Sequence, residues 1–98
     1  MVVTYKSKSI EKICTDVSKA IRKYGEEIAQ KIYQRLNEIR AVPSVEVMIQ
    51  CHIGRCHRLE GNRNGQYSVD LVHPYRLIFT VKDAQIQIAK IIEIVDYH

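Results

Sequence analysis

The sequence predicts an α+β domain in which an N-terminal strand and a helical hairpin pack on a twisted antiparallel sheet, in the order β-α-α-β-β-β-β. Three observations indicate this class. Apolar residues recur at spacings of three and four in the first half of the chain, and they alternate with polar residues in the second half. Pro43 separates the halves, because proline interrupts a helix. The length of 98 residues suits one domain, 1–98, rather than two.

A short β-prone run at 2–5 precedes the first predicted helix. The apolar positions of that helix share one face: Ile10, Ile13, Val17, Ile21 and Tyr24. Ser9 is a suitable N-cap for it, and Gly25 tolerates the positive φ at which many helices end. These positions predict one helix that ends next to Gly25.

The second predicted helix spans 26–40 and begins with two glutamates, which the positive end of a helix dipole favours. Its apolar stripe consists of Ile28, Ile32, Leu36 and Ile39. Segment 44–54 allows two interpretations, because Ser44 suits a helix cap although the next residues also alternate as in a strand. We favour a short helical turn followed by a loop.

Period-two alternation predicts strands in the second half of the chain. The runs at 67–71 and 77–81 alternate apolar and polar residues, as strands with one buried face do. Turn residues fall around these runs at 61–65, His73-Pro74 and Asp83-Ala84. The last run, 86–95, is apolar on both sides near its centre. We therefore expect it to be an interior strand of the sheet or a strand covered on both faces.

Composition and charge narrow the class of partner. The chain is 46% hydrophobic and 27% charged, as in folded soluble proteins, and it contains no run of about 18 apolar residues that predicts a membrane span. The N-terminus lacks the pattern of a signal peptide, and three cysteines are an odd number for a disulfide framework, so we expect a reducing cytoplasm. The net charge of +4 suits RNA or a ribosome surface, although such charges also serve to solvate small proteins.

Two motifs carry a resemblance to a known family. The segment 56–79, CHRLEGNRNGQYSVDLVHPYRLIF, contains a histidine, a Gly-Asn-Arg-x-Gly turn and an aromatic-arginine pair in this order, and the chain ends in Asp96-Tyr97-His98. In these features it resembles the HigB-type toxins of the RelE/ParE superfamily. The resemblance implies a β-α-α-β-β-β-β fold, a ribosome-dependent toxin that cleaves messenger RNA, and a HigA-like helix-turn-helix antitoxin as partner.

The same resemblance implies a catalytic set that needs no metal or other cofactor. Cleavage by the ribose 2′-hydroxyl requires a base, an acid and a cation that stabilises the phosphorane. Histidine transfers protons near neutral pH, and arginine grips phosphate with a planar fork. The predicted catalytic residues are His57, Arg76, Asp96, Tyr97 and His98, with Asp96 orienting a histidine and Tyr97 stacking on a base or bonding the phosphate.

The predicted RNA-binding residues are Arg55, Arg58 and Arg63, which surround His57 in sequence and extend its cationic surface. Each of them is individually also compatible with a solvated surface charge. Two positions depart from the HigB pattern: Glu60, where some members carry lysine, and Val72, where a second arginine can occur. Both departures put the strength of phosphate stabilisation in question.

Several alternatives stay open from the sequence. Arg76 can pair with Asp70 across a hairpin, while His57 can cap a strand. As whole functions, a ParE-like toxin that engages DNA gyrase and a toxin remnant that acts only as a corepressor of its antitoxin need no proton transfer. The pairs Cys51-His52 and Cys56-His57 supply four zinc-type ligands, but their spacing is not that of a zinc finger, so we expect no metal.

Overall fold

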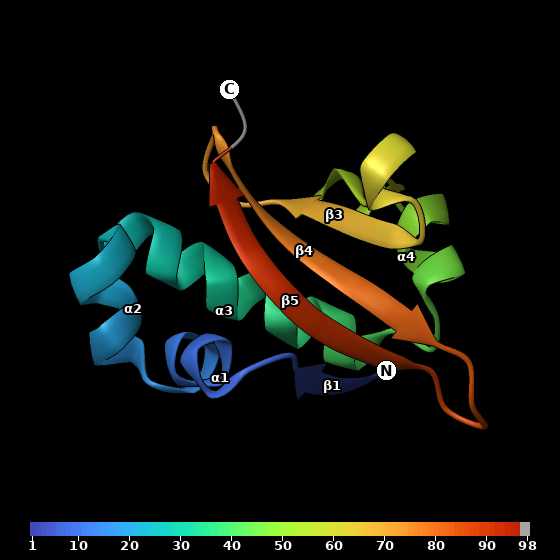
Figure 1. The fold of residues 1–98 in the computed structure, drawn as a ribbon, viewed down its shortest axis with the longest axis horizontal. Coiled ribbons are helices and arrows are strands. Elements are labelled where there is room, and N and C mark those ends of the chain that lie inside the picture. The colour runs from blue at the N-terminus through green and yellow to red at the C-terminus, as the bar shows by residue number, and fades with distance from the viewer. Residues whose placement is uncertain (97–98) are drawn as a thin grey trace.

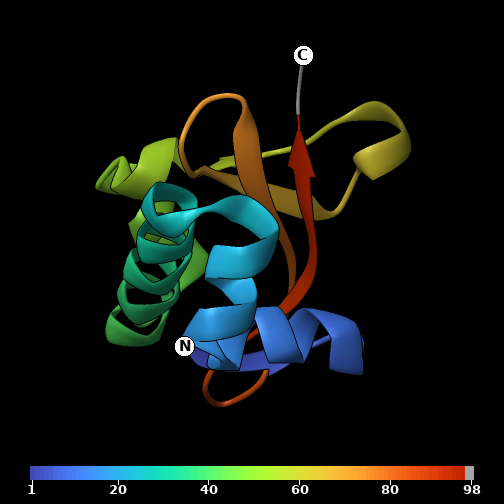
Figure 2. The same ribbon diagram turned by 90° about the vertical axis from the view of Figure 1, so that its left-hand side faces the viewer.

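The computed structural model describes residues 1–96 and confirms the α+β class. Five strands form one sheet: β1 (Val2–Tyr5), β2 (His57–Arg58), β3 (Gln66–Asp70), β4 (Tyr75–Lys82) and β5 (Ile88–Asp96). The helices of the described residues are α1 (Lys8–Thr15), α2 (Val17–Tyr24), α3 (Glu26–Ala41) and α4 (Val45–Gln50), with short 3₁₀ turns at Ile53–Arg55 and Gly61–Arg63. The α-helices gather mainly on one side of the sheet, as Figures 1 and 2 show.

The sheet is mixed, whereas the sequence predicted an antiparallel one. Its strand order is β1-β5-β4-β3-β2, and β1 runs parallel to β5, with Val3 opposite Ala89. The other neighbouring pairs are antiparallel. The direction of β1 depends on a partner more than eighty residues away, which alternation within β1 does not specify. The position of β5 between β1 and β4 confirms the prediction that the last run is an interior strand.

The first predicted helix is two helices, because Asp16 interrupts it. The backbone of Asp16 is extended, and its carboxylate accepts hydrogen bonds from the amides of Ser18 (3.1 Å) and Lys19 (3.3 Å). This N-cap starts α2, while the Asp16 amide still donates to the carbonyl of Lys12 at the end of α1. The N-cap of α1 is Ser7 rather than Ser9. Gly25, with φ of 88°, ends α2 as predicted.

The segment after Pro43 forms the predicted short helix. Ser44 caps α4, because its hydroxyl accepts a hydrogen bond from the amide of Val47 at 3.2 Å. Val45 and Met48 lie one turn apart on α4, and both are fully or almost fully buried. The interpretation of this segment as a strand is therefore wrong. None of the helices in residues 1–96 is long and apolar enough to cross a membrane.

The hydrophobic core lies between the helices and one face of the sheet, here called the core face. Its sheet residues include Val69, Leu77, Phe79, Ala89 and Ile91, and its helix residues include Ala29, Ile32, Leu36, Ile39 and Met48. Each large side chain buried in this way contributes about 1.5–3 kcal/mol to folding. The opposite face, here called the open face, lies away from the main helical layer, and the Gly61–Arg63 turn projects on its side (Figure 2). Residues that alternate with the core positions occupy this open face.

Candidate active site

The strand register arranges the side chains of the open face in cross-strand rows. The first row, at the start of β4, consists of Asp70, Arg76 and Val95. The second row consists of His57, Ser68, Ile78 and Glu93. Neighbouring strands lie about 4.8 Å apart, and successive rows lie about 6.8 Å apart. The backbones of His57 and Arg76 are therefore about 12 Å apart on one face, within reach of one RNA linkage and its neighbours.

The hydrogen bond of His57 fixes its neutral tautomer. His57 is half-buried on β2, and its Nδ1 lies 2.9 Å from the carbonyl oxygen of Arg55. A carbonyl oxygen only accepts hydrogen bonds, so Nδ1 carries the proton and donates it. The lone pair of neutral His57 is then on Nε2. A histidine in this state is prepared to accept a proton through Nε2, as a general base must.

Arg76 shares the carboxylate of Asp70 with Arg55. Arg76 NH1 lies 3.8 Å from Asp70 Oδ1, and Arg55 Nε lies 2.7 Å from Asp70 Oδ2. This hydrogen bond with Asp70 raises the pKa of Arg55 above its usual value. All three line a cavity of about 200 Å³ together with His73 and Tyr75. The cross-strand pair with Asp70, which the sequence allowed as an alternative role for Arg76, is present, and Arg76 also lines the cavity.

A partly buried arginine on α3, Arg35, supports this corner of the site. Arg35 Nε donates to the backbone oxygen of Asp70 at 2.6 Å, and its NH1 contacts Glu38 at 2.8 Å. The chain passes Arg35 so closely at Gly54 that an added Cβ would lie 2.8 Å from Arg35 Nε. Gly54 also has a φ of 58°, which glycine adopts without strain. Arg35 of the helical layer thus fixes the end of β3, and with it the position of Asp70.

Arg63 reaches across the open face. Its NH1 lies 2.7 Å from Glu93 Oε1 on β5 and 2.9 Å from Gln66 Oε1 on β3. Because β4 runs between these two strands, the guanidinium lies over β4, where Ile78 is fully buried. Glu93 is not among the residues predicted from the sequence. It stands in an apolar run, and only the strand register brings it opposite Ile78 and close to Arg63.

The structure brings together only part of the predicted RNA-binding set. Arg55 and Arg63 reach the open face near His57 and Arg76, as described above. Arg58 does not, because adjacent residues of a strand point to opposite faces. It pairs in register with Tyr67 and lies 6.0 Å from the centre of that ring, on the core-face side of β2. Arg58 therefore lies apart from His57 and Arg76, and its role in RNA binding stays a prediction.

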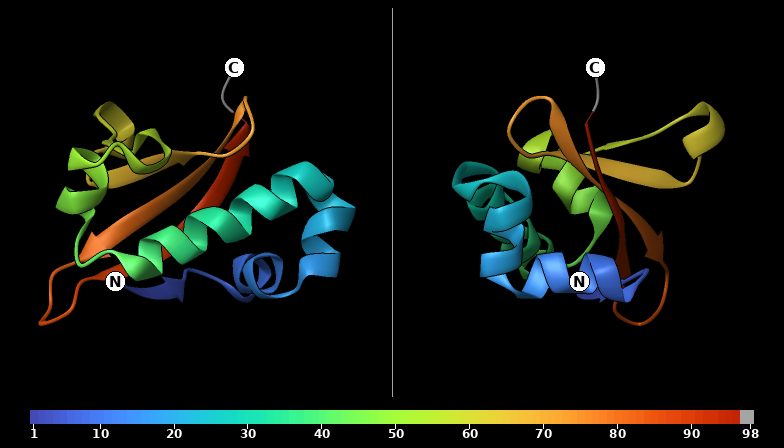
Figure 3. Two further views of the ribbon diagram at one scale, coloured as in Figure 1. Left: turned by 180° about the vertical axis from the view of Figure 1, so that it is seen from behind. Right: turned by 60° about the vertical axis from the view of Figure 1, so that its left-hand side comes forward.

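The predicted C-terminal motif is described only at its first residue. Asp96 ends β5 opposite Tyr75, which places its backbone beside the start of β4 and the His73-Pro74 turn (Figure 3). Its register puts it on the side of Tyr75 rather than on that of Arg76. Tyr97 and His98 lie outside the described residues. Their predicted roles stay predictions.

The Cys-His pairs do not form a metal centre in the described part of the chain. Cys56 is only 6% exposed and belongs to the core, and burial raises the pKa of its thiol to about 11. Metals bind the thiolate, which such burial disfavours. Cys51, in contrast, is exposed. Within residues 1–96 no three His, Cys, Asp or Glu side chains group so that they would hold a metal ion.

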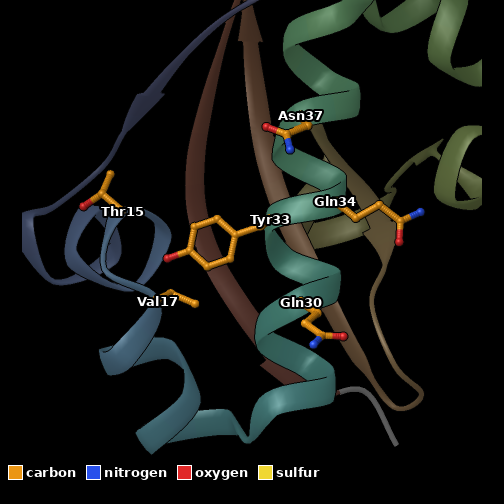
Figure 4. A pocket seen from close by; sticks show the side chains of 6 residues that line it. All are labelled: Thr15, Val17, Gln30, Tyr33, Gln34 and Asn37. Carbon is orange, nitrogen blue, oxygen red and sulfur yellow. The ribbon is translucent and has the colours of Figure 1, made fainter.

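A larger pocket, of about 650 Å³, lies between α1, α2 and α3, away from the open face (Figure 4). Its lining consists of Thr15, Val17, Gln30, Tyr33, Gln34 and Asn37. Tyr33 is the titratable group in that lining, and its hydroxyl donates to the carbonyl of Ile13 at 3.1 Å. Desolvation raises the pKa of Tyr33 further from neutrality. This pocket therefore lacks an acid-base pair, and the open face is the better candidate.

The fold, with helices mainly on one face of a mixed five-stranded sheet, matches that of YoeB/ParE toxins of the RelE/ParE-like superfamily. The chain is similar to a YoeB/ParE toxin from Agrobacterium tumefaciens, with a TM-score of 0.68 and 15% identity over 100% of both chains. It is also similar to chains of a YoeB-YefM complex and of a YoeB dimer, both from Staphylococcus aureus. Each is 26% identical over 100% of this chain and 97% of the other, with TM-scores of 0.65 and 0.64. No family model and no curated protein matches the sequence.

The two Staphylococcus aureus neighbours, each 26% identical, support the class of a type II toxin, the toxic partner of a toxin–antitoxin pair. This likeness does not distinguish the HigB-type toxins, which the sequence motifs resemble, from other RelE/ParE-like toxins.

Proposed function

We propose that this chain is the toxin of a type II toxin–antitoxin system and that it cleaves messenger RNA on the ribosome in the manner of HigB-type toxins. One observation carries the proposal. His57 is fixed with Nδ1 as donor and Nε2 as acceptor, on the sheet face that also presents Arg76 and Arg63. The likeness to YoeB chains supports the toxin class.

The proposed reaction is attack by the 2′-hydroxyl of the RNA itself. Nε2 of His57 takes the proton of that hydroxyl while its oxygen bonds to the adjacent phosphorus. The bond from phosphorus to the 5′-oxygen breaks, and His98 protonates this oxygen as it leaves. The products are a 2′,3′-cyclic phosphate and a 5′-hydroxyl, so protons and electrons balance without a metal or redox cofactor.

The remaining residues of the proposed set stabilise charge and orientation. Arg76, whose NH1 lies 3.8 Å from Asp70, grips the phosphorane oxygens with its planar fork. Tyr97 stacks on an unpaired base or donates to the scissile phosphate, and Asp96 orients His98. Arg55 and Arg63 attract the RNA backbone. Glu60 and Val72, exposed and half-buried respectively, leave the site without the extra cations of some HigB-like proteins.

The proposed partners are a HigA-like helix-turn-helix antitoxin, the ribosome and messenger RNA, all in the cytoplasm. One structural neighbour is a toxin solved with its antitoxin, the YoeB-YefM complex, which supports a protein partner of this kind. The ribosome would position the message over the open face. Its own contacts would compensate for the small number of cations at the site.

Induced expression in a bacterium, with and without the neighbouring helix-turn-helix gene, tests this function. We expect growth arrest that the second gene relieves, and transcript 5′ ends within translated codons. His57→Ala should abolish both effects. His52→Asn is a matched control, because it removes an exposed histidine whose φ of 55° asparagine tolerates. Intact messages with broken chromosomes would instead indicate a gyrase-directed toxin.

A further inference from the structure

The open face continues beyond the candidate active site towards the far end of the sheet. The next cross-strand row consists of Gln66, Thr80, Lys90 and Thr4, and the row after it contains Lys82, Ile88 and Val2. A groove of about 310 Å³ follows these rows, here called the lysine groove, and it is lined by Thr4, Thr80, Val81, Lys82, Ile88 and Lys90. Two ammonium groups and two hydroxyls thus share one shallow depression on the same face as His57.

The lysine groove keeps its positive charge. Lys82 and Lys90 are exposed, and the ion pairs among residues 1–96 do not include them. The two acids of the open face, Asp70 and Glu93, already contact arginines. Asp83 follows Lys82, but its carboxylate accepts a hydrogen bond from Gln87 at 2.9 Å. An anion would therefore find two lysines without competing carboxylates bonded to them.

Cations connect the groove to the candidate active site. Arg76 and Lys82 stand six residues apart on β4, which corresponds to about 20 Å along the strand. Arg63 lies between them, because it contacts Gln66 in the Lys90 row and Glu93 in the His57 row. Basic side chains thus follow one another from Arg76 past Arg63, which Glu93 neutralises in the free protein, to Lys90 and Lys82. The distance from Arg76 to Lys82 suits several nucleotides of a single strand.

We propose that the lysine groove binds the phosphate backbone of the substrate RNA several nucleotides away from the cleaved linkage. This inference rests on the proposed function, since it identifies the occupant by continuity with that site. Lysine ammonium and threonine hydroxyl groups are phosphate donors, and they hold a strand in register without reading its bases. An acidic peptide fits less well, because a peptide would pair with the backbone edge of β1, whereas the lysines project from the sheet face.

Salt-dependent binding of an uncleavable, 2′-O-methyl 12-nucleotide RNA tests the proposal. The variant is Lys82→Gln with Lys90→Gln, and the matched control is Lys12→Gln with Lys23→Gln, which removes two exposed lysines from α1 and α2. Each lost phosphate contact lowers the slope of log affinity against log salt by about 0.7 on a single strand. The rise in Kd between 50 and 200 mM salt should therefore be about sevenfold smaller in the groove variant. The control should retain the wild-type ratio.

Further arms of the experiment separate the possible outcomes. A trinucleotide, too short to reach the groove from Arg76, should bind the groove variant as it binds wild type. If the groove variant keeps the wild-type ratio of Kd between 200 and 50 mM salt for the 12-nucleotide RNA, the proposal is overturned. It is also overturned if the variant loses affinity only for polyglutamate or only for empty ribosomes. If wild type cleaves RNA but wild type and the groove variant bind RNA equally, the proposal for the lysine groove is refuted and the nuclease proposal stands. Groove-dependent binding without cleavage by wild type would refute the nuclease and leave the groove.

Discussion

Glu93→Gln offers a direct test of how the open face receives RNA. In the free protein Glu93 neutralises Arg63 across a distance of 2.7 Å, with the two side chains 41% and 32% exposed. A phosphate that binds Arg63 has to displace this carboxylate, and it also meets the repulsion of its charge. Glutamine keeps the size of the side chain and removes the charge. We therefore expect RNA to bind more tightly to Glu93→Gln than to wild type.

The magnitude follows from the exposure of the pair. A partly exposed ion pair contributes about 0.2–1 kcal/mol. If RNA has to break the pair, its removal raises the affinity by a factor of about 1.4–5. The same free energy is lost from folding. For a chain of 98 residues the entropy of unfolding is about 0.2 kcal/mol/K, so the Tm should fall by about 1–5 °C.

Fluorescence anisotropy with the uncleavable RNA and thermal unfolding by circular dichroism measure both effects. Glu27→Gln is the matched control, because it makes the same change of charge at an exposed position of α3 and should leave RNA binding nearly unchanged. Weaker RNA binding by Glu93→Gln, with the fold intact, would refute the reasoning. It would mean that Glu93 assists the ligand rather than competing with it.

Three further predictions concern buried groups and the phosphate clamp. Ser68 is fully buried beside His57, and its hydroxyl has no hydrogen-bond partner within residues 1–96. Because an unpaired buried hydroxyl destabilises the fold, Ser68→Ala should raise the Tm by about 5 °C. A lower Tm would show that the hydroxyl is bonded. Burial raises the thiol pKa of Cys14 and Cys56 from about 9 to about 11. At pH 8 both should therefore hold about 100-fold less thiolate than an ordinary thiol. Mass spectrometry after treatment with iodoacetamide should find the label mainly on the exposed Cys51. The contribution of the buried Cys14 and Cys56 thiols to stability is complete below about pH 9 and is lost as the pH rises towards 11. Equal labelling of all three thiols would contradict the buried positions. Arg76→Lys should cleave at least 10-fold more slowly than wild type in single-turnover assays, because lysine lacks the two-point grip, and an unchanged rate would remove Arg76 from the clamp.

Local sequence signals predicted much of the fold. The apolar periods specified the strands β3, β4 and β5 and the helix α3, and Gly25 and Ser44 occupy the boundaries expected of them. The break at Asp16 was missed, because a side-chain cap within an apolar helical pattern leaves that pattern unchanged. The parallel pairing of β1 with β5 was missed because register between distant segments is a property of the folded chain.

The candidate site was less predictable than the fold. The sequence was sufficient to predict that Arg58 points to the other sheet face than His57, since adjacent residues of a strand point to opposite faces. The contacts of Arg63 with Glu93 and of Arg35 with the Asp70 backbone were not available, because they join elements 30 and 35 residues apart. The role of Asp70 as shared acceptor for Arg55 and Arg76 also required the geometry of the turn beside it.

The single-turnover rate of cleavage on preformed ribosome–message complexes tests the central claim most directly. Wild type, His57→Ala and the control His52→Asn are compared, with circular dichroism confirming that each variant folds. Loss of a general base costs roughly 10²–10⁴-fold in rate. We predict a loss of this order for His57→Ala and a wild-type rate for His52→Asn. A wild-type rate in folded His57→Ala would contradict the account. The Nε2 lone pair of His57, which the hydrogen bond from Nδ1 to the Arg55 carbonyl leaves available, would then have no part in the reaction.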